Sequence, residues 1–240
     1  MPPRSAVTAV VAAAGSGERL GAGGPKAFVP VAGRPMVEWS IAALRACDSV
    51  RSIVVAAPPG HVGDLGGHDL AVVSGGSTRA QSVANALEAV GTGYVAIHDA
   101  ARPLVTPRLV EALVADLDAA PDAAGVIAAA PVTDTIKRAV KNLSGQLDAN
   151  TVSNRPLAVE ATEDRSRLWA AQTPQVFRTE ALREALAAAE RPEEATDEAI
   201  LVEWNGGTVL IHPVAGPNLK VTTPLDLRVA ELLLAERAGG

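Results

Sequence analysis

A glycine-rich stretch directly after an apolar segment, near the start of the chain, most strongly limits what this sequence can fold into. Residues 6–14 are rich in Ala and Val, which is typical of a strand buried on both faces of a parallel sheet. In residues 15–26, which follow, five positions are glycine, so the backbone can bend sharply and come close to a ligand. The sequence therefore predicts a strand whose carboxyl end leads into a binding loop.

This loop has the chemistry of an anion-binding site rather than of a plain surface linker. It carries two cations, Arg19 and Lys26, beside backbone N–H groups at the end of the predicted strand. A P-loop is excluded because Lys26 is followed by Ala27 instead of Ser or Thr. A dinucleotide-binding fingerprint is excluded because Leu20 occupies the position of its third glycine. We interpret the loop as the part of the protein that binds the triphosphate of a nucleotide.

Strand and helix patterns alternate at short spacing along the rest of the chain. We expect further strands at 52–57, 70–73, 94–97, 123–132, 208–212 and 218–221, and helices at 36–46, 77–90, 107–119, 180–189, 197–204 and 224–237. Ser77 and Thr196 are the expected N-caps of two of these helices. The alternation predicts a single α/β domain over residues 1–240, with a Rossmann-like, mostly parallel sheet and helices on both faces.

The stretch 138–166 interrupts this alternation. It is polar, contains several Asn residues and is broken by Pro156. We interpret it as a protruding β-arm. Such an arm has little core of its own, so we expect it to pack on another chain or to stay mobile.

Charged residues gather where the predicted strands end, which is where ligands bind on sheets of this kind. Asp99 and Arg102 lie in the segment 98–103, directly after a strand, and Lys220 lies on the expected strand 218–221. The chain has no nucleophile elbow and no His-Glu-x-x-His zinc motif. These charged residues suit an enzyme that catalyses attack on a phosphorus centre. In such a reaction, fixed cations and a Mg²⁺ ion held by Asp99 neutralise the charge of the phosphates.

Composition and charge exclude several classes of protein. The net charge of -6 argues against a nucleic-acid surface, which needs clustered cations. Cys47 is the only cysteine, so we expect no disulfide within the chain, a core position for this thiol and a cytoplasmic location. No apolar run approaches the ~20 residues that a membrane span needs. A secretory signal at residues 4–14 is disfavoured, because its removal would delete the first strand.

Taken together, the motifs resemble those of one family of nucleotidyltransferases. In chain order they are Ala13-Ala14-Gly15-Ser16-Gly17-Glu18-Arg19-Leu20, Pro25-Lys26, Gly75-Gly76 with Arg79 and Ser82, His98-Asp99-Ala100-Ala101-Arg102-Pro103, Pro131-Val132 with Asp134-Thr135-Ile136-Lys137, Arg165 with Leu168-Trp169, Gln172-Thr173-Pro174-Gln175, Thr196-Asp197-Glu198-Ala199, and Asn218-Leu219-Lys220-Val221-Thr222. This order resembles the 2-C-methyl-D-erythritol 4-phosphate cytidylyltransferase family of the non-mevalonate isoprenoid pathway. The likeness covers nearly the whole chain.

The resemblance implies a reaction of CTP with methylerythritol phosphate, which gives a CDP-alcohol and diphosphate. Arg19 and Lys26 would hold the triphosphate, Lys220 would stabilise the α-phosphate, and Asp99 would position Mg²⁺. The positions that match the CTP site are Ala13, Ala14, Gly15, Gly17, Gly76, Ser82 and Ala100. The positions that match the methylerythritol phosphate pocket are Thr135, Arg165, Thr173 and Thr196. Arg102 would either contact phosphate or pair with Asp99.

The resemblance also implies a homodimer, in which the arm brings Arg165 or Thr135 to the partner's site. Three other functions remain open at this point. A ribitol 5-phosphate cytidylyltransferase shares these motifs. A non-catalytic nucleotide sensor would bind CTP and release no diphosphate. A nicotinamide-dependent oxidoreductase would need an acidic residue at the end of the second strand, where Pro58 stands.

Overall fold

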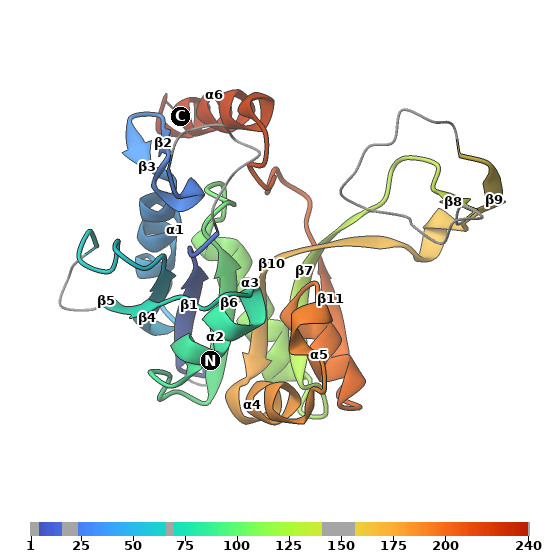
Figure 1. Cartoon of the computed structure of the whole chain (residues 1–240), viewed down its shortest axis with the longest axis horizontal. Coiled ribbons are helices and arrows are strands. Elements are labelled where there is room, and N and C mark those ends of the chain that lie inside the picture. Colours follow the sequence, from blue (N-terminus) through green and yellow to red (C-terminus); the bar gives the residue numbers. More distant parts are fainter. Residues whose placement is uncertain (1–4, 16–23, 66–69, 141–156, 240) are drawn as a thin grey trace.

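A computed structural model of the chain describes residues 5–15, 24–65, 70–140 and 157–239 (Figure 1). The strands of its central sheet are β1 (Val7–Ala12), β4 (Val50–Ala57), β5 (Leu70–Ser74), β6 (Tyr94–Asp99), β7 (Gly125–Pro131), β10 (Trp169–Arg178) and β11 (Val209–Pro213). They form a seven-stranded sheet in the order β11-β7-β10-β6-β1-β4-β5. Only β10 runs antiparallel to its neighbours, β6 and β7, so the predicted, mostly parallel sheet is confirmed.

Strand β10 was not among the strands predicted from the sequence. Pro174 lies inside it, and a proline usually argues against a central strand because it cannot donate to the ladder. The pairing with β7 shifts register between Ala171 and Gln175, so the proline falls where the ladder is interrupted. The strand can therefore carry this proline and still pair on both sides.

Helices cover both faces of the sheet, as predicted. Helices α1 (Met36–Arg45) and α3 (Pro107–Ala119) pack on one face, and α2 (Arg79–Leu87), α4 (Thr179–Ala188) and α5 (Glu198–Trp204) pack on the other. Alternation along β1 produces this arrangement: Val10 joins the α2 side, whereas Ala9 and Val11 join the α1 side. None of the described helices is long and apolar enough to cross a membrane.

The predicted caps were wrong by one residue in each case. Thr78, not Ser77, accepts a hydrogen bond from the backbone N–H of Gln81 at the start of α2. Asp197, not Thr196, caps α5 by accepting from the N–H of Ile200. Two adjacent residues can each serve as an N-cap, and the backbone decides which of them does.

The last element described is α6 (Pro224–Gly239), at the top of Figure 1. This helix packs on the short hairpin of β2 (Pro30–Val31) and β3 (Arg34–Pro35), which follows the 3-10 turn η2 (Lys26–Phe28). The prediction of a strand at 218–221 was wrong, because this segment is irregular. It is held by separate hydrogen bonds to a loop, such as that from Val221 N–H to Ala101 O at 2.8 Å.

The arm extends away from the central sheet, to the right in Figure 1. Strands β8 (Lys137–Ala139) and β9 (Val159–Thr162) form a separate, antiparallel two-stranded sheet. The 3-10 turn η3 (Arg165–Arg167) leads from the arm back into β10, and a further turn, η4 (Pro192–Glu194), precedes α5. The protruding hairpin is confirmed for these residues; 141–156 lie outside the described part.

Candidate active site

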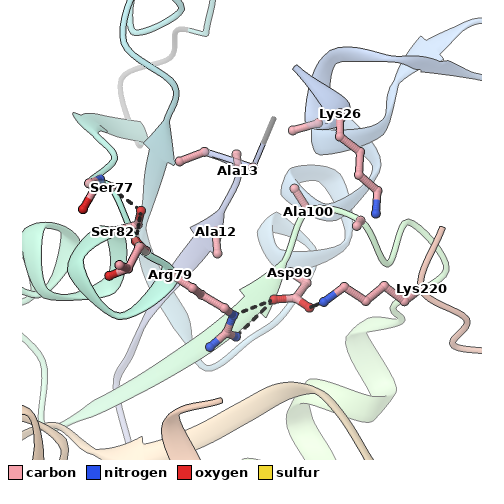
Figure 2. Close-up of a pocket in the computed structure, with 15 residues that line it drawn as sticks. Ala12, Ala13, Lys26, Ser77, Arg79, Ser82, Asp99, Ala100 and Lys220 are labelled. Carbon is pink, nitrogen blue, oxygen red and sulfur yellow. Dashed lines mark hydrogen bonds and ion pairs between the residues drawn. The ribbon is translucent and has the colours of Figure 1, made fainter. Parts of the chain in front are cut away.

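A cavity of about 460 Å³ opens at the carboxyl edge of the sheet (Figure 2). The loops after β1 and β6, the turn η2, the start of α2 and the loop that carries Lys220 surround it. Its lining residues are Ala12, Ala13, Ala14, Gly15, Lys26, Ala27, Gly76, Ser77, Thr78, Arg79, Ser82, Asp99, Ala100, Ala101 and Lys220. Segments far apart in sequence therefore meet where the strand pattern predicted a binding site.

Small residues let two of these loops approach closely. A Cβ atom added to Gly75 would lie 2.3 Å from the Cβ of Ala14, so only glycine fits there. The Ser82 hydroxyl accepts a hydrogen bond from Gly76 N–H at 3.0 Å and donates to Thr78 O at 2.8 Å. Ser82 is thus the residue that fixes the second glycine turn against the cavity.

Among the described residues that line this cavity, Asp99 is the only carboxylate, and it lies between two cations (Figure 2). Lys220 Nζ lies 2.7 Å from Asp99 Oδ2, and Arg79 Nη2 lies 3.1 Å from Oδ1. Burial alone would raise the pKa of Asp99, but Arg79 and Lys220 outweigh it and hold this pKa well below its usual range. Asp99 is therefore ionised at neutral pH.

Hydrogen bonds from both sides fix the loop that carries Lys220. Arg102 is buried and donates to the backbone oxygen of Asn218 at 2.7 Å. The Asn218 amide in turn donates to Gln172 Oε1 at 2.9 Å and to Thr173 O at 2.8 Å. We expected Arg102 either to contact phosphate or to pair with Asp99. Within the described residues Arg102 forms no ion pair with Asp99, and its hydrogen bond anchors the Lys220 loop instead.

A buried network connects Asp99 to β10. Asp99 N–H donates to Thr173 Oγ1 at 3.0 Å, and Thr173 Oγ1 lies 3.2 Å from His98 Nδ1. His98 Nε2 lies 3.3 Å from the carbonyl of Arg102, which can only accept, so Nε2 carries the proton and Nδ1 accepts from Thr173. Burial lowers the pKa of His98 to about 4, so the ring is neutral.

A second, smaller cavity of about 170 Å³ adjoins the first one and shares Arg79, Asp99 and Lys220 with it. Its other lining residues are Arg102, Ala171, Gln172, Thr173, Gln175, Thr196 and Asp197. The Thr173 hydroxyl donates its proton to His98, so it can only accept a hydrogen bond from a ligand.

Most of the predicted site residues meet in these two cavities. The first contains Ala13, Ala14, Gly15, Lys26, Gly76, Ser82, Asp99, Ala100 and Lys220, and the second contains Arg102, Thr173 and Thr196. Arg165 lies exposed on the arm and Thr135 lies exposed just before β8; neither lines a cavity, and Arg165 donates to the backbone oxygen of Thr133. Gly17 and Arg19 lie outside the described residues.

Sequence reasoning gave no role to Arg79 or Glu198, although both lie in the quoted motifs. Arg79 Nη1 donates to Glu198 Oε1, and Arg79 lines both cavities. A signal was present for Arg79. A cation in the first turn of a helix is unfavourable beside the positive end of the helix dipole, so a nearby anion was to be expected.

The arrangement can hold a polyanion and neutralise charge that develops on it. Lys26, Arg79 and Lys220 supply positive charge around one carboxylate. The described residues contain no cluster of three or more His, Cys, Asp or Glu side chains able to bind a metal. The thiol of Cys47 is buried, and burial together with Glu111 raises its pKa to about 12, which is unsuited to a nucleophile.

The comparison with known proteins decides between the remaining functions. The family model described as 2-C-methyl-D-erythritol 4-phosphate cytidylyltransferase matches residues 7–236. The chain belongs to this family. An enzyme of that name from Paraburkholderia phymatum is 40% identical over 98% of this chain and 99% of its own. One from Deinococcus radiodurans is 44% identical over 99% of this chain and 93% of its own.

The fold agrees with this membership. The crystal structure of 2-C-methyl-D-erythritol 4-phosphate cytidylyltransferase from Thermus thermophilus superposes with a TM-score of 0.75 at 34% identity. The match covers 97% of this chain and 100% of the other. As a member of this cytidylyltransferase family, the chain is an enzyme. The alternatives of an oxidoreductase and of a non-catalytic nucleotide sensor are therefore not supported.

Proposed function

We propose that this enzyme transfers the cytidylyl group of CTP to 2-C-methyl-D-erythritol 4-phosphate and releases diphosphate, as a step of isoprenoid biosynthesis. The observation that carries the proposal is the cavity in which Lys26, Arg79, Lys220 and Asp99 converge at the carboxyl edge of the sheet. The names of the relatives support methylerythritol phosphate as the acceptor over ribitol 5-phosphate.

The chemistry is a direct displacement at phosphorus. An oxygen of the acceptor phosphate forms a bond to the α-phosphorus of CTP, the bond from this phosphorus to the β-bridging oxygen breaks, and diphosphate leaves. No protein nucleophile is needed, because positioning and charge neutralisation supply the rate enhancement. Lys220 stabilises the charge on the α-phosphate, and Lys26 with Arg19 binds the leaving diphosphate.

The two cavities divide the substrates between them. The larger would take CTP, with Ala13, Ala14, Gly76, Ser82 and Ala100 around its base. The smaller takes the acceptor, beside Arg102, Thr173 and Thr196. They share Asp99 and Lys220, so the reacting phosphates would meet at these two residues.

Asp99 is the residue that would hold Mg²⁺. A single carboxylate fits this ion, because Mg²⁺ binds one or two carboxylates and takes further oxygens from substrate phosphates and water. When bound, the ion supplies positive charge to the phosphate oxygens. Lys220 Nζ lies 2.7 Å from Asp99 Oδ2, so the residue that would hold the ion and the residue that would stabilise the α-phosphate are neighbours.

The arm would complete the site of a second subunit. Arg165 lies on the arm and Thr135 lies just before it, and the arm carries exposed apolar residues, among them Val159, of which 60% is exposed. A homodimer in which each arm reaches the other chain would cover these residues and bring Arg165 and Thr135 to the acceptor. We place the enzyme in the cytoplasm, where a lone reduced thiol such as that of Cys47 is usual.

Diphosphate release tests this function. The enzyme is mixed with CTP and Mg²⁺, and methylerythritol phosphate or ribitol 5-phosphate is offered in parallel. We expect turnover with the first, and Lys26→Ala should lower it by about 10²–10³-fold without unfolding the chain. Arg108→Ala, which removes an exposed cation from α3, is the matched control. CTP binding without diphosphate release would contradict the function, and faster release with ribitol 5-phosphate would change the acceptor.

A further inference from the structure

The guanidinium of Arg79 bridges two carboxylates that come from different parts of the chain. Its Nε and Nη2 donate to Asp99 Oδ1 at 3.3 and 3.1 Å, and its Nη1 donates to Glu198 Oε1 (Figure 2 shows the Asp99 side). All three nitrogens therefore have a protein partner. Arg79 lines both cavities, and three of its five N–H donors are used on carboxylates of the protein.

Glu198 has no role of its own in either cavity. Only 1% of it is exposed, it lines neither cavity, and its Oε2 has no hydrogen-bond partner within the described residues. A buried carboxylate is costly unless it is paired. Burial raises the pKa of Glu198 and Arg79 opposes this rise, so the ionised form of Glu198 depends on Arg79.

Two roles are open to a cation placed like Arg79. It could leave Glu198 to bind a phosphate of CTP, or it could stay and hold Asp99. If Arg79 left Glu198 to bind a phosphate, Glu198 would remain as an unpaired buried charge, which is strongly unfavourable. The second keeps both carboxylates paired, and it fixes the orientation of Asp99 through one oxygen while Oδ2 faces Lys220.

We propose that Arg79 is a positioning residue for Asp99, that Glu198 is its anchor, and that the pair presents Asp99 Oδ2 to the metal of the nucleotide complex. This inference rests on the proposed function, in which Asp99 binds Mg²⁺. It assigns Arg79 to the orientation of the metal-binding carboxylate rather than to the grip on the triphosphate. Lys26 and Lys220 then remain as the phosphate-facing cations of the described cavity.

CTP binding with and without Mg²⁺ separates the two roles. Calorimetry gives the Kd for CTP in EDTA, and a Mg²⁺ titration gives the concentration that produces half of the metal-dependent gain in affinity. Glu198→Gln removes the anchor charge at nearly constant size. Arg79→Gln/Glu198→Gln removes both charges, so the net charge around the cavity stays the same. Glu180→Gln, at an exposed ion pair on α4, is the matched control.

We expect Glu198→Gln and the double variant to raise the half-effective Mg²⁺ concentration about tenfold, with the metal-free Kd changed by no more than about twofold, because outer partners of a metal ligand tune metal affinity. Arg79→Lys should show the same shift, since one ammonium group cannot hold two carboxylates as a guanidinium does. It also keeps the buried positive charge, so it covers the case in which a neutral variant fails to fold. Glu180→Gln should behave as the wild type.

A metal-free Kd that rises tenfold in the double variant would overturn the inference, because Arg79 would then be a phosphate ligand. An unchanged Mg²⁺ dependence in all three variants would overturn it as well. The proposed function fails separately: it falls if the wild type releases no diphosphate. A wild type that binds CTP equally well with and without Mg²⁺ removes the metal role of Asp99, and the inference falls with it.

Discussion

Replacing Thr173 by valine removes one hydroxyl that serves two buried partners. This hydroxyl accepts from Asp99 N–H at 3.0 Å and donates to His98 Nδ1 at 3.2 Å, and only 3% of Thr173 is exposed. Valine has nearly the same shape, so the change leaves two polar groups unpaired without opening a large void. Each of the two unpaired groups costs about 1–3 kcal/mol, so we expect Thr173→Val to lower the free energy of unfolding by about 2–6 kcal/mol.

The loss is measured by urea unfolding, with thermal unfolding as a second assay. For a chain of this length, a loss of this size lowers Tm by roughly 4–24 °C. Turnover should also fall, because the unpaired amide belongs to Asp99. The matched control is Thr173→Ser, which keeps the hydroxyl and loses one methyl group at a cost of about 1 kcal/mol. If Thr173→Val proves as stable as Thr173→Ser, the hydroxyl does not hold this network and the assigned His98 tautomer is wrong.

Three further predictions concern other parts of the fold. Gly75→Ala should lower both stability and CTP affinity, measured by urea unfolding and calorimetry, because the new Cβ would lie 2.3 Å from that of Ala14; wild-type values would contradict this contact. Cys47 should resist a thiol reagent at pH 8 in the native state and react once urea unfolds the chain, since burial raises its pKa to about 12; rapid native labelling would contradict its burial. The Thr222 hydroxyl and the backbone N–H groups of Thr222 and Thr223 lower the pKa of Asp226 from 3.8 to about 2. Asp226→Asn should therefore cost stability above pH 4, and the difference from the wild type should vanish as the pH falls to about 2.

The position of the site could be predicted from the sequence because it follows from the alternation of strands and helices. Parallel strands bring their carboxyl ends to one edge, so Lys26, Asp99 and the Gly76 turn had to lie close together. The segments that form β1 and β6 are short and mostly apolar, as in strands buried on both faces, which makes these strands easy to recognise.

The Arg79–Glu198 pair could not be predicted in the same way. These residues are 119 positions apart, and their contact depends on how α5 packs beside α2. The irregular segment around Lys220 was also missed, because the side chains of Arg102 and Asn218 hold it in place of a backbone ladder with a strand. Local pattern carries no information about such long-range pairs.

The stereochemical course at the α-phosphorus tests the central claim most directly, namely that acceptor and CTP react with each other and not with the protein. CTP with sulfur in place of one non-bridging α-oxygen, in a single configuration, is turned over with methylerythritol phosphate, and the configuration of the product is determined by phosphorus NMR. A single in-line displacement inverts this centre, and inversion is the result that we predict. Retention would mean two displacements through a covalent cytidylyl-enzyme, and it would contradict the account.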